Sequence, residues 1–543
     1  MLSRALIDEK LVGAESTTLC HFFFKDNDEQ DNIATALCAL LHQFFCAHEH
    51  LLERHAASVA KKCGQTLKNE FEELWQVLIS AATDPSAGDV ICFLDALDEC
   101  RQPDRDKLIV QLERFYSTAL GKLKLESKLK FLVTSRPYDE IERRFRILTR
   151  QVPTIRLAGE EESEKISREI GAVMEAKVKE IAEELDLDED VQSSLHDRLC
   201  EIPNRTYLWL HLILDEIKNA LGQTKKKLLK AVDTLPRTVE EAYEKILAKC
   251  KQEEAKRVLQ IIVAAQRPLT LSEIDVALEI GPRSISYKAL DLEGDAKRKK
   301  WISKSCGLFV SIVDSRVYLI HQTAREFLIR ENNEISGPQE WRHSIDLQKA
   351  HQVLSEICVT HLLFREFQEY RIPTNVDEPY FTGGSPAIHA YVKKYAFLDY
   401  SARHWIFHVQ EAHTDDLNWV SKIATLCDIG DGLSYTWFCT YSMSTYLPYM
   451  LTRQSTKQSA LYWAAVFGLI NETQFLLDDG INPNEQGGYF GNALQAAAYS
   501  GYEEIAKLLI NSGADTNAKG GEYDSALQAA CYRGHKAVLD ILL

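Results

Sequence analysis

Three stretches of the sequence share one pattern at a fixed spacing: SALYWAAVFG at 459–468, NALQAAAYSG at 492–501 and SALQAACYRG at 525–534. Two further segments, LLDDGINPN at 476–484 and LINSGADTN at 509–517, recur with the same step of 33 residues. A fixed period of this length predicts stacked copies of one helical unit, each burying its apolar face against its neighbours.

A period of 33 residues is typical of the ankyrin repeat, a β-turn followed by two antiparallel helices. Gly480 and Gly513 suit the left-handed residue that ends a helix. We assign about two and a half repeats to residues 457–543, and expect them to bind a protein partner on a concave surface. The alternative is that they only pack on the rest of the chain. Because Leu543 falls inside a predicted second helix, we expect the native array to continue or the chain to be a truncated product.

Short apolar runs near the N-terminus predict buried strands at 19–25, 90–94, 130–134 and 154–157. Helical segments such as 33–45 separate them. This alternation predicts a parallel α/β sheet with helices on both faces.

Charged residues follow two of these strands directly. Asp95 ends the strand at 90–94, and a single carboxylate there suits Mg²⁺, which prefers few carboxylates plus phosphate oxygens and water. Asp98 or Glu99 would polarise an attacking water. Arg136, after the strand at 130–134, would reach a γ-phosphate. The alternatives are an acidic loop without a ligand and a surface arginine that closes a strand.

These segments together resemble the NACHT branch of the STAND NTPases, in particular the fungal NACHT–ankyrin proteins with a nephrocystin-like N-terminal module. The resemblance rests on residues 21–45, 91–100, 130–138, 205–217, 267–278 and 319–328. It implies a P-loop NTPase core that binds ATP or GTP with Mg²⁺ and forms a homo-oligomer through that module. It also implies a part in fungal self/non-self recognition or innate-type defence.

One feature of that family is absent from the sequence. A P-loop is a glycine-rich loop ending in Gly-Lys-Ser or Gly-Lys-Thr, and neither tripeptide occurs in the 543 residues. In the family this loop immediately precedes a helix like residues 1–11. We therefore expect an incomplete sheet whose strands carrying Asp95 and Arg136 either face a gap or close on each other. We also expect weak or no ATP binding by this chain, and binding by a full-length product.

The middle of the chain is predicted to be mainly helical. Following an NTPase core at 1–160, we assign a helical domain to 161–237, a winged helix to 238–332 and a helical spacer to 333–456. The winged helix is predicted from three helices followed by a hairpin at 308–312 and 317–320.

Two features of the winged-helix region have alternative interpretations. His321 follows the hairpin, and the STAND resemblance implies that it touches a nucleotide phosphate; the alternative is a histidine that satisfies its own helix start. The basic run at 297–300 would contact DNA phosphates or, as we favour, remain solvated.

Composition narrows the classes of partner and compartment. A net charge of −17 argues against general nucleic-acid binding. No apolar run approaches the roughly 18 residues that span a bilayer, so we expect no membrane insertion. The thirteen cysteines include no CxxC pair, which favours a reducing, cytoplasmic location.

The sequence thus leaves two main functions open. One is a signalling switch and scaffold that couples an NTPase module to partner-binding repeats. The other is a nucleotide-independent ankyrin binding protein with a degenerate core. A third hypothesis, an active ATPase that receives its phosphate loop from elsewhere, is the least favoured.

Overall fold

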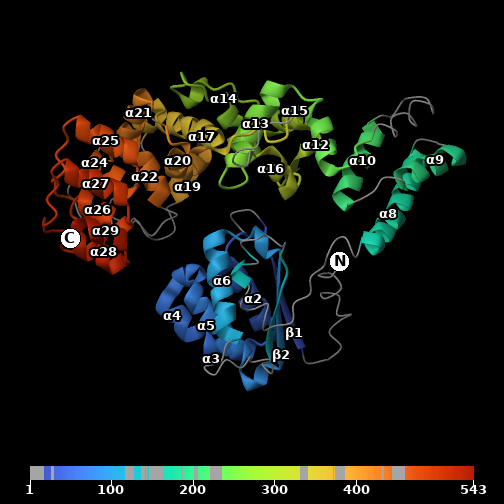
Figure 1. The fold of residues 1–543 in the computed structure, drawn as a ribbon, viewed down its shortest axis with the longest axis horizontal. Helices are drawn as coiled ribbons and strands as arrows, with labels where there is room; N and C mark the ends of the chain where they lie inside the picture. The colour runs from blue at the N-terminus through green and yellow to red at the C-terminus, as the bar shows by residue number, and fades with distance from the viewer. Residues whose placement is uncertain are drawn as a thin grey trace. The chain divides into compact units, whose positions relative to one another are not determined.

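The computed structural model describes residues 17–25, 30–116, 128–135, 141, 143–145, 163–184, 188–200, 206–219, 235–329, 340–370, 372, 386–414, 416–429, 433–442 and 459–543. The chain divides into two compact units, Met1–Glu161 and Glu162–Leu543, which are blue and green-to-red in Figure 1. Arg136, the strand expected at 154–157 and the helix expected at 1–11 lie outside the described residues.

The first unit contains a three-stranded parallel sheet in the order β1-β2-β3. Its strands are β1 (Thr17–Phe23), β2 (Asp89–Asp95) and β3 (Leu129–Val133). This confirms the three expected strands that fall in the described part of the chain. β2 pairs with β3 along its length, with Val90 opposite Leu129 and Leu94 opposite Val133. Of the two outcomes expected for these strands, direct closure is the one observed.

Helices α2 (Ile33–Ala47), α3 (Glu49–His55), α4 (Ala57–Cys63), α5 (Phe71–Ala82) and α6 (Gln102–Tyr116) complete this unit. Alternate side chains of the three strands, Cys20, Phe22, Val90, Cys92, Leu94 and Leu129, share one core with α2, α5 and α6. The opposite face of the sheet lies outside that core; there Phe93 is 1% exposed and Leu132 is 38% exposed. The sequence predicted helices on both faces, whereas the described helices line one.

The second unit begins with three helices, α8 (Ser163–Glu184), α9 (Glu189–Cys200) and α10 (Tyr207–Asn219). They share a small core in which Trp209 is 1% exposed. The Trp209 indole N–H donates to the Pro236 carbonyl at 2.9 Å. Trp209 therefore packs in the core of this three-helix group.

A helical group with a hairpin follows at 235–329. It comprises α12 (Val239–Leu247), α13 (Gln252–Ala264), α14 (Leu271–Glu279), α15 (Asp295–Cys306), β4 (Val310–Val313), β5 (Arg316–Leu319) and α16 (Gln322–Leu328). Four helices precede the hairpin where the sequence predicted three. The turn is made by Asp314 and Ser315, both with positive φ, as a two-residue hairpin requires.

The spacer and the array consist of helices joined by turns and loops in their described parts. The spacer contains α17 (Leu347–Leu362), α18 (Arg365–Glu369), α19 (Pro386–Lys394), α20 (Leu398–Ala412), α21 (Leu417–Cys427) and α22 (Leu433–Ser442). The array contains α24 (Ala460–Val466), α25 (Ile470–Asp478), α26 (Ala493–Ser500), α27 (Glu503–Asn511), α28 (Ala526–Arg533) and α29 (Lys536–Leu542), drawn in orange and red in Figure 1.

The repeated residues explain how each ankyrin helix starts and stops. Ser459, Asn492 and Ser525 are N-caps, and each side chain accepts a backbone N–H from the first turn that follows. Gly480 and Gly513 have φ of 86° and 91°, the left-handed conformation that glycine adopts at no steric cost. The predicted repeat architecture is confirmed.

One hydrophobic core runs through most of the second unit, from Leu212 on α10 to Val538 on α29. Its aromatic junction joins the spacer to the first repeat. The ring of Trp437 lies 5.1 Å from that of Trp405 and 5.8 Å from that of Phe467, and Phe438 lies 4.9 Å from Trp463. The repeats are thus packed on the spacer rather than tethered to it.

Within the described residues, no helix combines the length and apolar character needed to cross a membrane. All thirteen cysteines are free thiols. Burial raises the pKa of Cys20, Cys100 and Cys306 to about 12, so these thiols stay protonated and act as small apolar side chains.

Buried histidines join α17 to α20. His351 and His408 approach through their Nδ1 atoms at 3.0 Å, and His408 Nε2 lies 2.8 Å from the Tyr400 hydroxyl. The Tyr400 oxygen also accepts the Gln266 backbone N–H at 3.0 Å. This geometry fits two neutral rings, with Tyr400 donating to His408 and His408 donating to His351. Burial accordingly lowers the pKa of His351 to about 4.

His361 makes a second link between the same helices. It is fully buried, and its Nδ1 pairs with the Ser401 hydroxyl at 2.9 Å. Its Nε2 has no hydrogen-bond partner among the described residues, and the rings of Phe364, Phe367 and Phe397 surround it. Burial lowers the pKa of His361 to about 3.

We expect His361→Phe to reduce the acid sensitivity of the second unit. His361 is neutral in the fold but titrates near 6.5 when unfolded, so its contribution is intact above pH 6.5 and is lost as pH falls toward 3. At about pH 5 the loss is about 2 kcal/mol. Urea unfolding should show that the free energy of unfolding falls less between about pH 7.5 and about pH 5 for the variant than for the parent protein. An equal fall in the free energy of unfolding of both proteins would show that His361 does not contribute to the acid sensitivity.

Candidate functional site

Asp95 lies at the carboxyl edge of the sheet, the edge where parallel α/β sheets bind ligands. Its Oδ1 accepts the Thr134 hydroxyl at 2.6 Å, and the Thr134 oxygen accepts the Ala96 backbone N–H at 3.0 Å. The Asp95 carbonyl accepts the Phe24 N–H at 3.0 Å. Hydrogen bonds from both neighbouring strands therefore fix the tip of β2.

Asp98 and Glu99 lie in the short turn that follows, Leu97–Glu99. Ala96 enters this turn with φ of 55°, a left-handed conformation that costs a residue with a Cβ roughly 1–2 kcal/mol. Leu97 is fully buried, and its N–H donates to the Thr134 carbonyl at 2.9 Å. The turn is thus anchored from within, and both carboxylates are partly exposed at the same edge as Asp95.

These residues fit one part of a magnesium–nucleotide site. Among the described residues, no three or more His, Cys, Asp and Glu side chains gather in a way that would hold a metal. A single carboxylate suffices when water and phosphate oxygens supply the remaining Mg²⁺ ligands, and Asp95 has that position. The sequence offers no Gly-Lys-Ser or Gly-Lys-Thr loop to cradle the phosphates, and Arg136 lies outside the described residues. The described residues therefore make up only part of such a site.

His321 belongs to the second unit, where it caps α16. Its Nδ1 accepts the Thr323 backbone N–H at 3.2 Å and lies 2.9 Å from the Thr323 hydroxyl. That hydroxyl also pairs with the Tyr243 hydroxyl at 2.9 Å. These contacts fit the interpretation of His321 as a helix-start residue, and its contact with a nucleotide stays a prediction.

The basic run at 297–300 is not uniformly solvated. Arg298 is 4% exposed, and its Nε donates to Asp275 Oδ1 at 2.6 Å. Its guanidinium also reaches Glu279 at 3.1 Å and lies 5.0 Å from the Trp301 ring. The arginine is therefore engaged inside the fold, while the three lysines around it are exposed.

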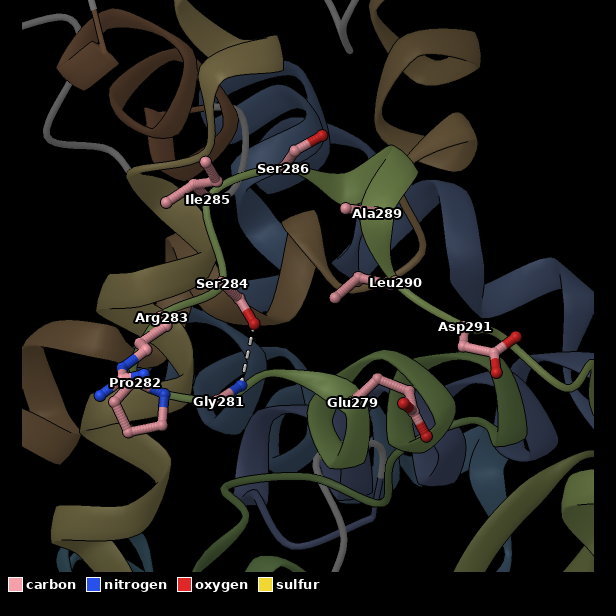
Figure 2. Close-up of a pocket in the computed structure, with 10 residues that line it drawn as sticks. All are labelled: Glu279, Gly281, Pro282, Arg283, Ser284, Ile285, Ser286, Ala289, Leu290 and Asp291. Atoms are coloured by element: carbon pink, nitrogen blue, oxygen red, sulfur yellow. Dashed lines mark hydrogen bonds between the residues drawn. The ribbon is translucent and has the colours of Figure 1, made fainter.

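A shallow hollow of about 550 Å³ follows α14 (Figure 2). One loop forms it, with lining residues Glu279, Gly281, Pro282, Arg283, Ser284, Ile285, Ser286, Ala289, Leu290 and Asp291. The Ser284 hydroxyl accepts the Gly281 N–H at 3.0 Å, which fixes the bend of the loop in Figure 2. None of the predicted site residues lines it, so the hollow adds nothing to the candidate nucleotide site.

Sequence reasoning missed a set of neighbouring tyrosines on the array, Tyr489, Tyr499, Tyr523 and Tyr532. The repeat itself contains a signal for them. Tyr499 and Tyr532 are 33 residues apart, as are Phe490 and Tyr523. Aligning the repeats by their period would have shown aromatic residues recurring at two positions.

The fold defines a class: a multidomain protein with a parallel α/β module, a helix-and-hairpin domain, a helical spacer and an ankyrin array. Family profiles agree with these parts. Residues 1–136 match the nephrocystin 3 N-terminal family, 243–336 the winged helix domain of GPI inositol-deacylase, and 441–520 the ankyrin repeats. A domain of unknown function matches 166–235.

Two fungal proteins are similar to the chain. The vegetative incompatibility protein HET-E-1 of Podospora anserina is 26% identical over 336 residues, which are 61% of this chain and 23% of that protein. The azaphilone pigments biosynthesis cluster protein L of Monascus ruber is 24% identical over 321 residues, covering 54% and 63% of the two chains. The chain thus spans less than two thirds of either relative. Together with the profile matches, these similarities support the resemblance to the fungal NACHT–ankyrin proteins.

We expect Thr134→Val to loosen the edge of the sheet that carries Asp95. Valine preserves the shape of threonine but leaves the Ala96 N–H and Asp95 Oδ1 without the hydroxyl that bonds both. The loss should cost about 1–3 kcal/mol. Hydrogen exchange of peptides covering 89–100 should accelerate, whereas Thr134→Ser, which keeps the hydroxyl, should exchange like the parent. Unchanged exchange in the valine variant would show that the bridge contributes no local stability.

Proposed function

We propose that this chain is a signalling scaffold of the STAND type, in which the ankyrin array recognises a protein partner and the binding is passed to the winged-helix domain. The continuous core of the second unit carries this proposal. Ankyrin repeats present extended surfaces for protein recognition, because each unit contributes equivalent side chains to one face. A partner that binds the array therefore binds a body that includes the spacer and the winged helix.

The junction between the spacer and the first repeat supports such coupling. The Gln410 side chain donates to the Phe467 carbonyl at 2.7 Å, and the Asn471 side chain donates to the Thr414 carbonyl at 2.7 Å. Both bonds join the end of α20 and its following loop to the first repeat. Packed interiors rearrange between discrete states rather than deform smoothly. A shift at this junction would therefore change the packing of both the spacer and the ankyrin array.

The name of the Podospora relative indicates the kind of signal. That relative is a vegetative incompatibility protein. We extend this role to the present chain as part of the proposal: partner recognition in fungal self/non-self discrimination or defence. The proposal places the protein in the cytoplasm, with self-association through the α/β module as the means of output.

Nucleotide dependence divides this proposal into two versions. In the first, Mg²⁺ bound near Asp95 and a nucleotide set the state of the α/β module, with Asp98 or Glu99 acting on water and Arg136 and His321 contacting phosphate. In the second, the chain acts without nucleotide. Direct pairing of β2 with β3 and the lack of a Gly-Lys-Ser or Gly-Lys-Thr loop favour the second version for this chain.

Trp437→Ala is expected to loosen the spacer and the array together. Trp437 is fully buried at the aromatic junction, and its indole N–H donates to the Leu426 carbonyl at 3.2 Å. Removing it should cost about 3–5 kcal/mol. Hydrogen exchange should accelerate in α20 and α22 and also in α24 and α26, because all four share one core.

Leu417→Ala is the matched control, because Leu417 lies in the same spacer but is 70% exposed. It should leave exchange in the array unchanged. If Trp437→Ala accelerates exchange in the spacer alone, the array is not coupled to it and the proposal fails.

Nucleotide binding is expected to be weak or absent. A fluorescent ATP analogue with Mg²⁺, titrated with the whole chain, should show no saturable binding in the micromolar range typical of nucleotide sites. Saturable binding that is lost in Asp95→Ala would establish the nucleotide-dependent version instead. Thr134→Ser, which retains the bridge to Asp95, is the control for local disturbance of the strand tip.

A further inference from the structure

The missed tyrosines form one cluster, which we call the tyrosine face: Tyr532 is exposed, and Tyr489, Tyr499 and Tyr523 are half-buried. Tyr523 is at its centre, with ring centroids 5.1 Å from Tyr499, 5.0 Å from Tyr532 and 6.3 Å from Tyr489. Tyr499 and Tyr532 come from the ends of α26 and α28, and Tyr489 and Tyr523 from the loops before those helices. Tyr532 is 71% exposed, so one side of the cluster is open to a partner.

The backbone under this face is fixed by close packing of the two loops. The Glu522 N–H donates to the Tyr489 carbonyl at 2.9 Å, and the Gln495 side chain donates to the Gly520 carbonyl at 3.2 Å. Gly521 has φ of 67°, and a Cβ on it would lie 2.2 Å from the Phe490 carbonyl oxygen. The rings are therefore held in place before any partner arrives, which lowers the entropy cost of binding.

One ring of the tyrosine face already carries a cation. The Arg533 guanidinium carbon lies 4.9 Å from the centre of the Tyr499 ring. Cations are attracted to aromatic faces at this distance, and guanidinium groups are the commonest protein partners. The chain's own Arg533 thus shows how a guanidinium sits on this surface, while Tyr532 next to it is largely uncovered.

The charges around the face have the complementary sign. Residues 459–543 contain ten Asp and Glu and four Lys and Arg, an excess of six negative charges. Glu485 and Glu522 are exposed on the two loops that carry Tyr489 and Tyr523. Asp524 is paired with Lys519 at 3.0 Å. Glu485, Glu522 and Asp524 against Lys519 and Arg533 leave one net negative charge on the residues of the face and its two loops. The carboxylates would therefore attract a cationic peptide segment from a distance, and the tyrosine rings would then bind its cationic side chains.

We propose that the tyrosine face binds a basic, extended segment of a partner protein, with an arginine side chain stacked on the exposed ring of Tyr532 and paired with Glu522. The proposal rests on the proposed function, since it names the chemistry of the partner that the array recognises. Arginine should be preferred over lysine, because a planar guanidinium stacks on a ring and forms paired hydrogen bonds with a carboxylate.

The test uses the whole chain and short fluorescent peptides in which every third residue is Arg and the others are Gly and Ser. Matched peptides carry Lys, Glu or Pro in place of Arg. Fluorescence anisotropy should give the tightest binding for the Arg peptide, weaker binding for Lys and none for Glu. Raising NaCl from about 0.15 M to about 0.5 M should weaken binding, because salt screens exposed charges.

Tyr532→Ala should weaken the Arg peptide about five- to tenfold, the range expected for one cation–π contact. Because Tyr532 is largely exposed, the Tyr532→Ala variant should fold normally, and circular dichroism checks its fold. Glu522→Gln should also weaken binding of the Arg peptide, and the affinity of this variant should depend less on NaCl concentration. Tyr370→Ala is the matched control, since Tyr370 is 52% exposed but lies in the spacer, and should leave affinity unchanged.

Three results would overturn the inference: no binding of the Arg peptide, equal binding of the Glu peptide, or affinity unaffected by Tyr532→Ala. Tighter binding of the Pro peptide, weakened by Tyr532→Ala, would also overturn it while leaving the array as a peptide-binding surface. Failure of the proposed function is seen separately, in the hydrogen-exchange response to Trp437→Ala, which involves no peptide.

Discussion

Helices α17 and α20 pack along each other, and most of the ordered structure in the second unit is attached to this pair. His351 meets His408 and His361 meets Ser401 across their interface. Tyr400 on α20 accepts the Gln266 N–H that follows α13, which ties the winged-helix region to the pair. On the other side, Trp405 of α20 contacts Trp437 and Phe467, which ties in the first repeat.

Polar groups buried in such an interface must all be hydrogen-bonded. Each ring must stay neutral and each hydrogen must point to one acceptor, because an unpaired or charged group in an apolar core is costly. The hydrogen-bonded chain from Gln266 through Tyr400 and His408 to His351 meets that demand, and it is compatible with one relative position of the two helices. The helix pair therefore holds the winged-helix region and the ankyrin repeats in a fixed relative position.

The first unit has a different constraint. Thr134 bonds both Asp95 and Ala96, so the ends of β2 and β3 are locked side by side at the edge where a nucleotide site would form. β2 and β3 pair directly with each other, and the turn that carries Asp98 and Glu99 follows β2. The ankyrin repeats support binding of a protein partner, whereas a nucleotide-dependent state of the α/β module stays a prediction.

Local patterns in the sequence determined the ankyrin helices, their caps, the three described strands and the hairpin. Each depends on neighbouring residues: Ser459, Asn492 and Ser525 cap the helices that follow them, and glycine ends helices because it alone adopts positive φ freely. The position of Asp95 at a strand tip followed from the same reasoning. Tertiary structure alone decided the pairing of β2 with β3, the burial of Arg298 against Asp275 and the gathering of four tyrosines on one face. Those features join residues from different helices and strands, and contacts between such segments depend on how the elements pack, which the local pattern of either segment does not contain.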